Sequence, residues 1–211
     1  MELFSYFRSS AAYRLRIAFN LKGIAHDIRP VNLLKAEHKS EEYLAMNPQG
    51  LVPALKIDDG RVLTQSTAIL EYIEATQAGQ ALLPSDEFEA AIVRSWVNQI
   101  ACDIHPVNNL RILKYLSGEL GVDDDAKNSW YKHWIDVGFR ALEEQLGDGP
   151  FCYGEQVTLA DVYLVPQVYN AKRFQVDMSQ FPKISAIVDH CNRLDAFVQA
   201  MPEHQPDAPQ S

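Results

Sequence analysis

The sequence predicts a small α/β domain followed by an all-helical domain. Over residues 1–80 short apolar runs alternate with helical segments, whereas only helical periods occur from residue 87 to about residue 200. Neither pattern continues through residues 78–86, which are rich in turn-forming residues. A chain of 211 residues is long enough for two small domains but not for two large ones. We therefore expect domains at 1–80 and 87–211.

The first domain is predicted to have the element order β-α-β-α-β-β-α. Ser9 and Ser10 can cap the first helix, and Gly23 is suited to the position that follows its end. The sequence Asp58-Asp59-Gly60 is typical of a tight turn between two strands. This order predicts a parallel strand pair joined by a helix, followed by a hairpin. We expect strands at 3–7, 24–31, 51–57 and 61–64, and helices from Ser9 to Gly23, at 37–46 and from Ser66 onward.

The second domain is predicted to contain long helices and a loosely held end. One sharp local signal is Thr158-Leu159-Ala160-Asp161, which fits a capping box, with Val157 and Val162 placed as a hydrophobic staple. This motif stabilises a helix start and carries no chemistry. The tail 201–211 has three prolines and no apolar periodicity, so we expect it to be loosely held. The helices are expected at 88–116 with a bend near Pro106, at 124–146, from Thr158, and at 184–194.

Composition and charge exclude several classes of function. The net charge of −9, from 28 acidic and 19 basic residues, opposes sequence-independent binding to nucleic acid. The three cysteines are far apart, which opposes a disulfide framework or a paired-cysteine metal site and suits a reducing compartment. Neither a Gly-rich phosphate loop nor a zinc-ligand spacing is present, and no apolar run is long enough to span a membrane. We expect a cytoplasmic protein that is either an enzyme or a binding module for a small molecule, without a metal, a membrane or a nucleic acid.

Ser9 and Ser10 form the first candidate site. They lie between the first strand and the first helix, next to Arg8. A helix N-terminus presents free N–H groups and a partial positive charge, so it stabilises an anion such as a thiolate. The simpler interpretation, which the residues alone favour, is that both serines only cap the helix.

Two further segments of the first domain could contact a ligand. Val52-Pro53 could form a cis peptide bond that exposes Val52 to an extended peptide-like ligand, although an ordinary trans proline is the simpler interpretation. Gln65-Ser66 could bind a carboxylate at a helix start, although a capping role for Ser66 is simpler.

Polar residues also gather on the first long helix of the second domain. A lone histidine is seldom a ligand or a base, but its polar neighbours here favour a wet cleft. Arg173 follows an apolar helix, a position where arginine usually complements the helix dipole. The cluster comprises Asp103, His105, Asn108, Asn109 and Arg111.

In combination and order, these features resemble the cytosolic glutathione transferases, and more narrowly their zeta class. The resemblance implies a thioredoxin-like N-terminal domain, a helical C-terminal domain and a homodimer. It extends over nearly the whole chain and is carried by the stretches Tyr6-Phe7-Arg8-Ser9-Ser10, Arg14-Leu15-Arg16-Ile17-Ala18, Asn47-Pro48-Gln49-Gly50-Leu51-Val52-Pro53, Gln65-Ser66, Asp103-Ile104-His105-Pro106, Leu164-Val165-Pro166-Gln167-Val168, Arg173-Phe174-Gln175-Val176-Asp177 and Gln205-Pro206-Asp207.

The same resemblance implies a set of site residues. Ser9, Ser10 and Arg8 would be catalytic, and Arg8 and Arg173 would bind the carboxylates of a cis-diacid substrate. One position departs from the family, because its motif usually reads Ser-Ser-Cys and the third residue here is Ala11. Glutathione would contact Ser9, Ser10, Ala11, His38, Val52, Pro53, Gln65, Ser66, Asp103, His105 and Asn109.

The resemblance implies glutathione-dependent cis–trans isomerisation of maleylacetoacetate to fumarylacetoacetate in aromatic amino-acid catabolism. The thiolate of glutathione would add to the double bond, allow rotation and leave again. Maleylpyruvate is a second possible substrate, but Leu110-Arg111 stands where maleylpyruvate isomerases can carry two arginines. The resemblance also leaves open a general zeta-class transferase and a non-catalytic binding protein of the same fold. The retained serine and proline motifs oppose the non-catalytic protein.

Overall fold

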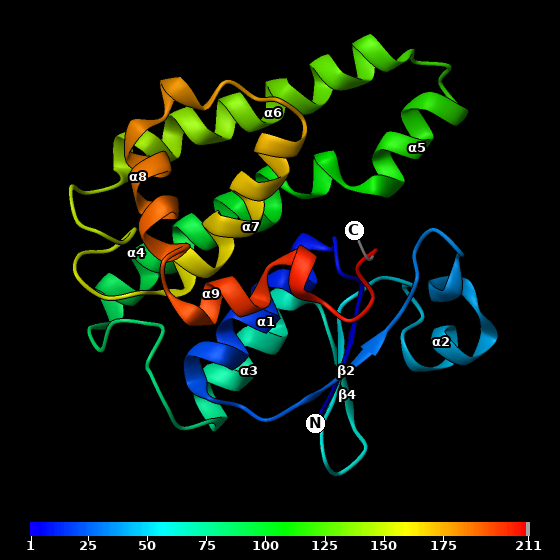
Figure 1. The fold of residues 1–211 in the computed structure, drawn as a ribbon, viewed down its shortest axis with the longest axis horizontal. Helices are drawn as coiled ribbons and strands as arrows, with labels where there is room; N and C mark the ends of the chain where they lie inside the picture. Colours follow the sequence, from blue (N-terminus) through cyan, green and yellow to red (C-terminus); the bar gives the residue numbers. More distant parts are fainter. Residues whose placement is uncertain (210–211) are drawn as a thin grey trace. The chain divides into compact units, whose positions relative to one another are not determined.

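The computed structural model describes residues 1–209 and forms two compact units (Figure 1). The first unit comprises residues 1–82 and 193–209, and the second comprises residues 83–192. The sequence predicts one helical domain over residues 87–211. The structure differs, because α9 (Asp195–Ala200) in the segment after Arg193 packs on α1 (Ser10–Lys22) of the first unit.

A four-stranded mixed sheet forms the centre of the first unit. The strands are β1 (Glu2–Ser5), β2 (Asp27–Pro30), β3 (Ala54–Lys56) and β4 (Val62–Thr64), in the order β2-β1-β3-β4. β1 pairs with β2 in parallel, and β3 pairs antiparallel with both β1 and β4. The predicted parallel pair and hairpin are therefore confirmed, although each strand is shorter than its apolar run.

Helices of the first unit differ from the sequence prediction over 37–46 and in the C-terminal segment. A 3₁₀ turn, η1 (Glu37–Lys39), precedes α2 (Glu41–Met46), so the single helix predicted over 37–46 is wrong. Ser40 interrupts it, because its extended backbone starts α2 and its Oγ accepts a hydrogen bond from Tyr43 N. The other helices are α1 (Ser10–Lys22), which ends at left-handed Gly23 as predicted, α3 (Ser66–Thr76), α9 (Asp195–Ala200) and the 3₁₀ turn η5 (Pro202–His204).

The C-terminal segment is bound to α1 rather than loosely held. Arg16, which is almost fully buried in α1, donates from Nε to the Ala200 carbonyl over 3.0 Å. Asn20 Nδ2 donates to the Ala196 carbonyl over 2.9 Å. The prediction of a loose tail at 201–211 is wrong over its described residues, because Phe7 N donates to Asp207 Oδ2 over 2.9 Å and Gln205 Nε2 donates to the Met201 carbonyl over 2.9 Å. Proline content does not reveal such contacts.

The second unit contains helices and no strand element within residues 83–192. α4 (Glu87–Asn98) runs into a π-helical segment, η2 (Gln99–Ile104), and then a 3₁₀ turn, η3 (Pro106–Asn108). The continuous helix predicted over 88–116 is thus interrupted, at and before Pro106, which lacks the N–H that a helix needs. The remaining helices are α5 (Leu110–Gly118), α6 (Asp124–Gln145), α7 (Leu159–Arg173), η4 (Met178–Gln180) and α8 (Pro182–Cys191).

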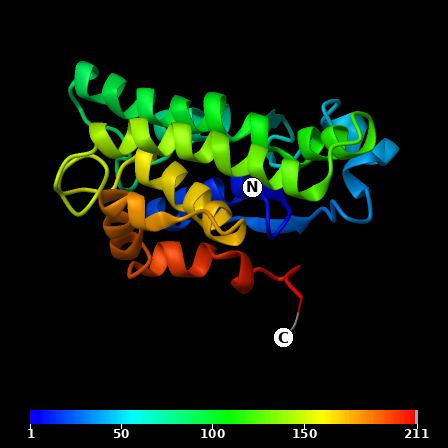
Figure 2. The same cartoon turned by 90° about the horizontal axis from the view of Figure 1, so that it is seen from above.

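Helix α7 is the centre of the second unit and is buried along most of its length. It packs against α4 and α8, and α6 packs against α8 and the π-helical segment (Figure 2). The predicted capping box is present, since Thr158 N donates to Asp161 Oδ2 over 2.8 Å and both staple valines, Val157 and Val162, are buried.

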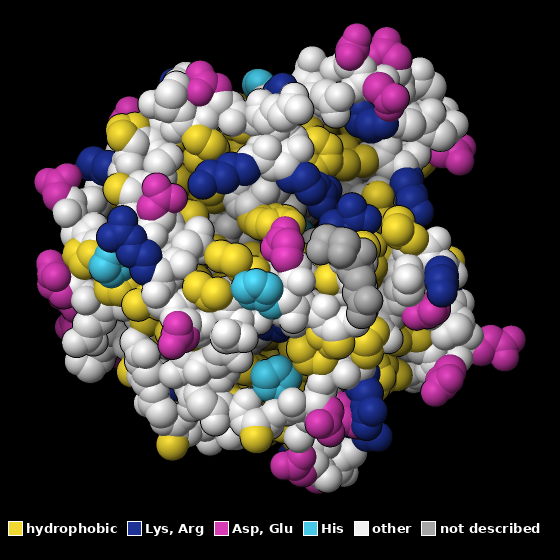
Figure 3. All heavy atoms as spheres, in the orientation of Figure 1, with side chains coloured by type: hydrophobic (Ala, Val, Ile, Leu, Met, Phe, Trp, Pro, Cys, Tyr) yellow, Lys and Arg dark blue, Asp and Glu magenta, His cyan; other side chains and the backbone are white. Residues whose placement is uncertain are grey.

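Acidic side chains are dispersed over the face seen in Figure 3, and Lys and Arg side chains lie among apolar ones. Within residues 1–209, none of the helices combines the length and the apolarity that crossing a bilayer requires.

Candidate functional site

The sheet register brings three predicted site segments to one edge of the first unit. Phe4 near the end of β1 pairs with Ala54 at the start of β3, and Ala54 pairs with Thr64 at the end of β4. The turn after β1, the residues before β3 and the residues after β4 therefore lie at the same end of the sheet. These are the segments that carry Ser9 and Ser10, Val52 and Pro53, and Gln65 and Ser66.

Ser9 is the N-cap of α1 and Ser10 is its first residue. Ser9 Oγ accepts a hydrogen bond from Ala12 N over 3.2 Å, and Ser9 N closes a turn onto the Tyr6 carbonyl over 2.8 Å. The capping role is confirmed, and it leaves the Ser9 hydroxyl hydrogen available to donate. Arg8 is exposed within this turn, and its Nη2 donates to the Tyr6 hydroxyl over 3.3 Å.

The Val52–Pro53 peptide bond is cis, so the simpler expectation of a trans proline is wrong. The preceding residue is held firmly, because the Leu51 carbonyl accepts hydrogen bonds of 2.7 Å from both Tyr43 Oη and Asn47 Nδ2. Within residues 1–209, neither the N–H nor the C=O of Val52 has a hydrogen-bond partner. Val52 thus offers one donor and one acceptor at the sheet edge.

Gln65 and Ser66 begin α3, but Ser66 is not its cap. The cap position is Gln65, which has φ 70° and makes no side-chain capping bond. A positive φ is uncommon outside glycine and is concentrated at functional sites. The buried Ser66 hydroxyl instead accepts a hydrogen bond from Arg14 Nη1 over 3.1 Å. The Gln65 side chain therefore does not cap the N–H groups in the first turn of α3. The buried guanidinium of Arg14 contacts this turn through Ser66.

His38 is joined to the same edge through the turn at Gly50. Gly50 has φ 57°, and a Cβ there would lie 2.9 Å from the His38 carbonyl oxygen, so only glycine permits this approach. The turn also contacts the start of α3, since Gln65 Nε2 donates to Gln49 Oε1 over 2.7 Å. His38 lies in η1, and all the predicted site residues between Arg8 and Ser66 belong to the first unit.

The other predicted contacts lie in the second unit. Asp103 is exposed in the π-helical segment, and His105 follows it. His105 Nε2 and Asn109 Nδ2 are 3.5 Å apart, and Asn109 caps α5 by accepting from Arg111 N. These residues occupy turns and a cap rather than the regular helix that the sequence predicted.

Arg173 ends α7 and lies on an aromatic stack. Its guanidinium carbon is 4.9 Å from the centre of the Phe174 ring, which stacks on Tyr131 at 3.6 Å. Asn108 Nδ2 donates to the Tyr131 carbonyl over 3.0 Å, so the stack connects Arg173 to the segment that carries His105. Burial raises the pKa of Tyr131 to about 12, and the nearby Arg173 opposes that rise.

Two buried or partly buried groups of the first unit were missed by the sequence analysis. Arg14 supports Ser66, and Asp207 Oδ2 accepts a hydrogen bond of 2.9 Å from Phe7 N beside the Ser9 turn. Arg14 offered a signal, since a charged residue in a largely apolar helix is rarely buried without a role. Asp207 lies in a stretch that carries the family resemblance, but nothing in the sequence pointed to its partner, which is 200 residues away.

Two of the three cysteines are buried and one is exposed. All three are free. Burial raises the pKa values of the Cys152 and Cys191 thiols, so both stay protonated near neutral pH, and Cys102 is exposed on the π-helical segment. Residues 1–209 contain no group of three or more His, Cys, Asp or Glu side chains that could hold a metal ion.

Two family models match the chain. Residues 8–76 match the glutathione S-transferase N-terminal domain, and residues 135–190 match the corresponding C-terminal domain. A probable maleylacetoacetate isomerase of Vibrio cholerae is 49% identical over 98% of this chain and 97% of its own length.

Two solved structures have the same fold over the whole chain. A maleylpyruvate isomerase described as a bacterial zeta-class glutathione S-transferase has a TM-score of 0.96 and 46% identity, covering 99% of this chain and 100% of its own. A maleylacetoacetate isomerase of Methylobacterium extorquens AM1 with bound malonate and glutathione has a TM-score of 0.96 and 36% identity, with 100% coverage of both chains.

Proposed function

This chain belongs to the zeta class of the glutathione S-transferases, and on that premise we propose that it is a glutathione-dependent isomerase that converts maleylacetoacetate to fumarylacetoacetate. One observation carries the proposal. Three features lie at the same end of the sheet. They are the start of α1 with its two serines, the unpaired backbone of Val52, and the start of α3, which the buried Arg14 supports. This set of groups suits a peptide that carries a thiol and a carboxylate.

The residues at the sheet edge fit glutathione part by part. The backbone N–H and C=O of Val52 can pair with the cysteinyl residue of the tripeptide as a short antiparallel strand does. The first turn of α3, with Gln65 and Ser66, can accept the γ-glutamyl carboxylate, because free helix N–H groups favour an anion. Arg14 holds the Ser66 oxygen from behind, so the Ser66 hydroxyl hydrogen is directed away from the guanidinium.

Bound glutathione would supply the thiolate that adds reversibly to the substrate double bond and permits its rotation. Ser9 and Ser10 would hold the sulfur at the N-terminus of α1, where hydroxyl donors and the helix dipole favour the ionised thiol. Ala11 provides no polar group, so the two serine hydroxyls would be the side chains that hold the sulfur. His38 and Pro53, and in the second unit Asp103, His105 and Asn109, are further proposed contacts of glutathione.

Arg8 and Arg173 are proposed to bind the carboxylates of the substrate. A guanidinium pairs with a carboxylate through two parallel hydrogen bonds and stabilises negative charge that develops on a conjugated acid. Arg8 is exposed beside the serine turn in the first unit. Arg173 is exposed at the end of α7, and its position over Phe174 restricts the guanidinium without neutralising it.

A spectroscopic isomerase assay, run side by side on maleylacetoacetate and maleylpyruvate with and without glutathione, tests the proposal. We expect glutathione-dependent turnover with a higher kcat/KM for maleylacetoacetate. A higher kcat/KM for maleylpyruvate would instead assign maleylpyruvate as the substrate, as the name of a maleylpyruvate isomerase that is 46% identical to this chain indicates for that relative. Retention on immobilised glutathione without turnover of either diacid would instead support a binding protein or a general transferase.

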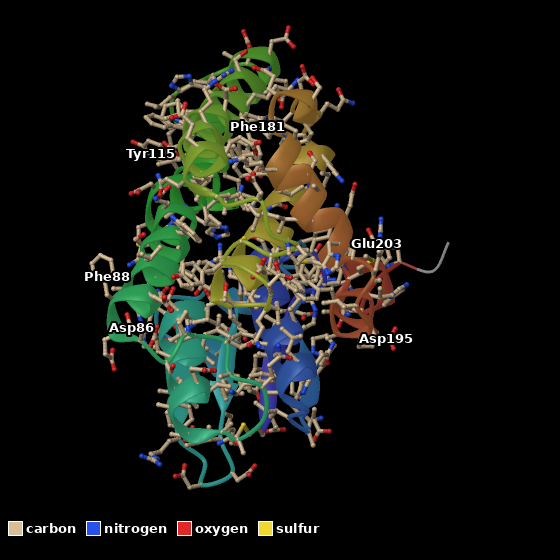
Figure 4. The ribbon with its side chains drawn as sticks, turned by 90° about the vertical axis from the view of Figure 1, so that its left-hand side faces the viewer. Asp86, Phe88, Tyr115, Phe181, Asp195 and Glu203 are labelled. Atoms are coloured by element: carbon tan, nitrogen blue, oxygen red, sulfur yellow. The ribbon has the colours of Figure 1, made fainter. Side chains whose placement is uncertain are left out.

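We further propose a homodimer in the cytoplasm. The second unit exposes large apolar side chains, including Phe88 at 76% exposure, which points away from α4 in Figure 4. The three free cysteines fit a reducing compartment. Light scattering on the purified protein tests the dimer, and Phe88→Glu is expected to shift it toward monomer.

A further inference from the structure

The C-terminal segment reaches the turn that carries Ser9 and Ser10. Phe7 N donates to Asp207 Oδ2 over 2.9 Å, and the Phe7 carbonyl accepts from Arg16 Nη2 over 3.0 Å. Both polar groups of the Phe7 residue are therefore held. Phe7 is the second residue of the turn that closes from Ser9 N to the Tyr6 carbonyl.

Arg16 connects this turn to the same segment a second time. Its Nε donates to the Ala200 carbonyl at the end of α9, and its Nη1 donates to Ser5 Oγ over 3.2 Å. The Arg16 side chain is almost fully buried, and its guanidinium joins one acceptor at the end of α9 to two acceptors at and just after the end of β1, which holds them in one geometry.

The path between α9 and Asp207 is itself ordered. Gln205 is buried, and its Nε2 donates to the carbonyls of Gln199 and Met201 over 3.0 and 2.9 Å. Ala208 N then bonds to the Gln205 carbonyl over 3.0 Å, which closes a turn around Asp207. The carboxylate is thus placed by its own segment rather than by chance contact with Phe7.

We propose that Asp207 is a positioning residue for the thiol-binding turn, an inference that rests on the proposed function. Asp207 holds Phe7 N and thereby the turn that ends at Ser9. This turn sets the position of the α1 N-terminus and of the Ser9 and Ser10 hydroxyls relative to the glutathione sulfur. Small displacements of such groups lower rates strongly, because their hydrogen bonds to the ionised thiol depend on position.

Asp207→Ala, Asp207→Asn and Asp195→Ala are the variants that test this role. Asp207→Ala removes the acceptor. Asp207→Asn keeps one oxygen that can face Phe7 N, and within residues 1–209 the other carboxylate oxygen has no partner to lose. Asp195 is the matched control, because it is an exposed carboxylate at the start of α9 in the same segment (Figure 4).

The readouts are the thiolate absorbance of enzyme-bound glutathione at neutral pH, kcat, KM for glutathione, and amide hydrogen exchange over residues 6–12. For Asp207→Ala we expect less bound thiolate, a kcat lower by about tenfold and faster exchange in the turn. Asp207→Asn and Asp195→Ala should stay close to the parent. Hydrogen exchange also reports whether each variant is folded.

A purely structural role would lower the thermal midpoint of Asp207→Ala while leaving bound thiolate and kcat unchanged, and that result overturns the inference alone. A parent protein that binds no glutathione overturns the proposed function and the inference together. An Asp207→Asn variant as impaired as Asp207→Ala also contradicts positioning through the Phe7 hydrogen bond. If Asp207→Ala does not fold, Asp207→Asn decides the question. Amide exchange over residues 6–12 and bound thiolate equal to those of the parent retain the proposal, and faster amide exchange in this turn rejects it.

Discussion

Arg14 Nη1 donates a 3.1 Å hydrogen bond to Ser66 Oγ, which joins the second turn of α1 to the first residue of α3 inside the first unit. Only 2% of the Arg14 surface is exposed, so the guanidinium brings a positive charge into a poorly solvated region. An incoming carboxylate at the start of α3 would offset part of that desolvation cost. The contact therefore relates the buried arginine to ligand binding as well as to folding.

Ser66→Ala should weaken glutathione binding and change kcat little. It removes a hydroxyl donor to the carboxylate and also the acceptor for Arg14, and hydrogen bonds that involve a charged group contribute about 1.5–3 kcal/mol. We expect the Kd for glutathione, measured by calorimetry, to rise by about tenfold or more. Thr76→Ala, at the exposed far end of α3, is the matched control and should leave Kd unchanged. Equal Kd values for both variants would remove Ser66 from the site.

Ser9→Ala and Ser10→Ala should separate capping from chemistry. Ser9 caps α1, so Ser9→Ala is expected to lower the free energy of unfolding by about 1 kcal/mol, whereas Ser10→Ala should lower it less. Urea denaturation measures this difference. Loss of either hydroxyl should reduce the fraction of bound glutathione that is ionised. Unchanged thiolate absorbance in both variants would contradict their proposed contact with the sulfur.

Arg173→Ala should impair turnover while glutathione binding survives, and Arg8→Ala should do the same. Loss of one charged contact to a developing anion is expected to lower kcat/KM for the diacid by about 10²-fold. Lys172→Ala removes the neighbouring exposed charge, which lies 3.9 Å from the Asp189 carboxylate, and should have little effect. Steady-state assays with saturating glutathione measure the effect. Equal losses at positions 172 and 173 would indicate general attraction by charge instead.

Gly138→Ala should destabilise the second unit, which is the reverse of the usual effect of alanine in a helix. A Cβ at Gly138 would lie 2.3 Å from Ile104 Cδ1, and Ile104 is buried in the π-helical segment. Overpacking of this kind costs about 1–3 kcal/mol. Gly118→Ala, where a Cβ would meet nothing within 4 Å, is the control and should be neutral or stabilising. Thermal unfolding of both variants gives the sign directly.

Cys102 should be the thiol that reacts first with an aromatic disulfide reagent in the folded protein. Burial raises the pKa values of the Cys152 and Cys191 thiols, so at mildly alkaline pH both remain protonated and poorly reactive. Titration should release about one equivalent of chromophore at once, and Cys102→Ser should abolish that phase. Rapid reaction of all the thiols before denaturation would contradict their burial.

Local sequence patterns predicted the features that depend on neighbouring residues. The Thr158 capping box, the left-handed Gly23 and the turn before β4 are each decided within a few residues, so propensity and side-chain chemistry suffice. The helix predicted over 88–116 is interrupted near Pro106, where the sequence predicted a bend, but the π-helical segment before it was not predicted. The close approach of Ile104 to Gly138 in that segment depends on tertiary packing, which helical periodicity does not reveal.

The sequence by itself determined the fold class, the two helix starts that bear serines and, through its resemblance to the zeta class, the proposed chemistry. Only the tertiary structure decided that Arg14 supports Ser66, that Val52 keeps both backbone groups unpaired within residues 1–209, and that Asp207 reaches Phe7. The physical reason is distance along the chain. Arg14 and Ser66 are 52 residues apart and Phe7 and Asp207 are 200 apart, and no local preference encodes a contact whose geometry is set by the packing of whole elements.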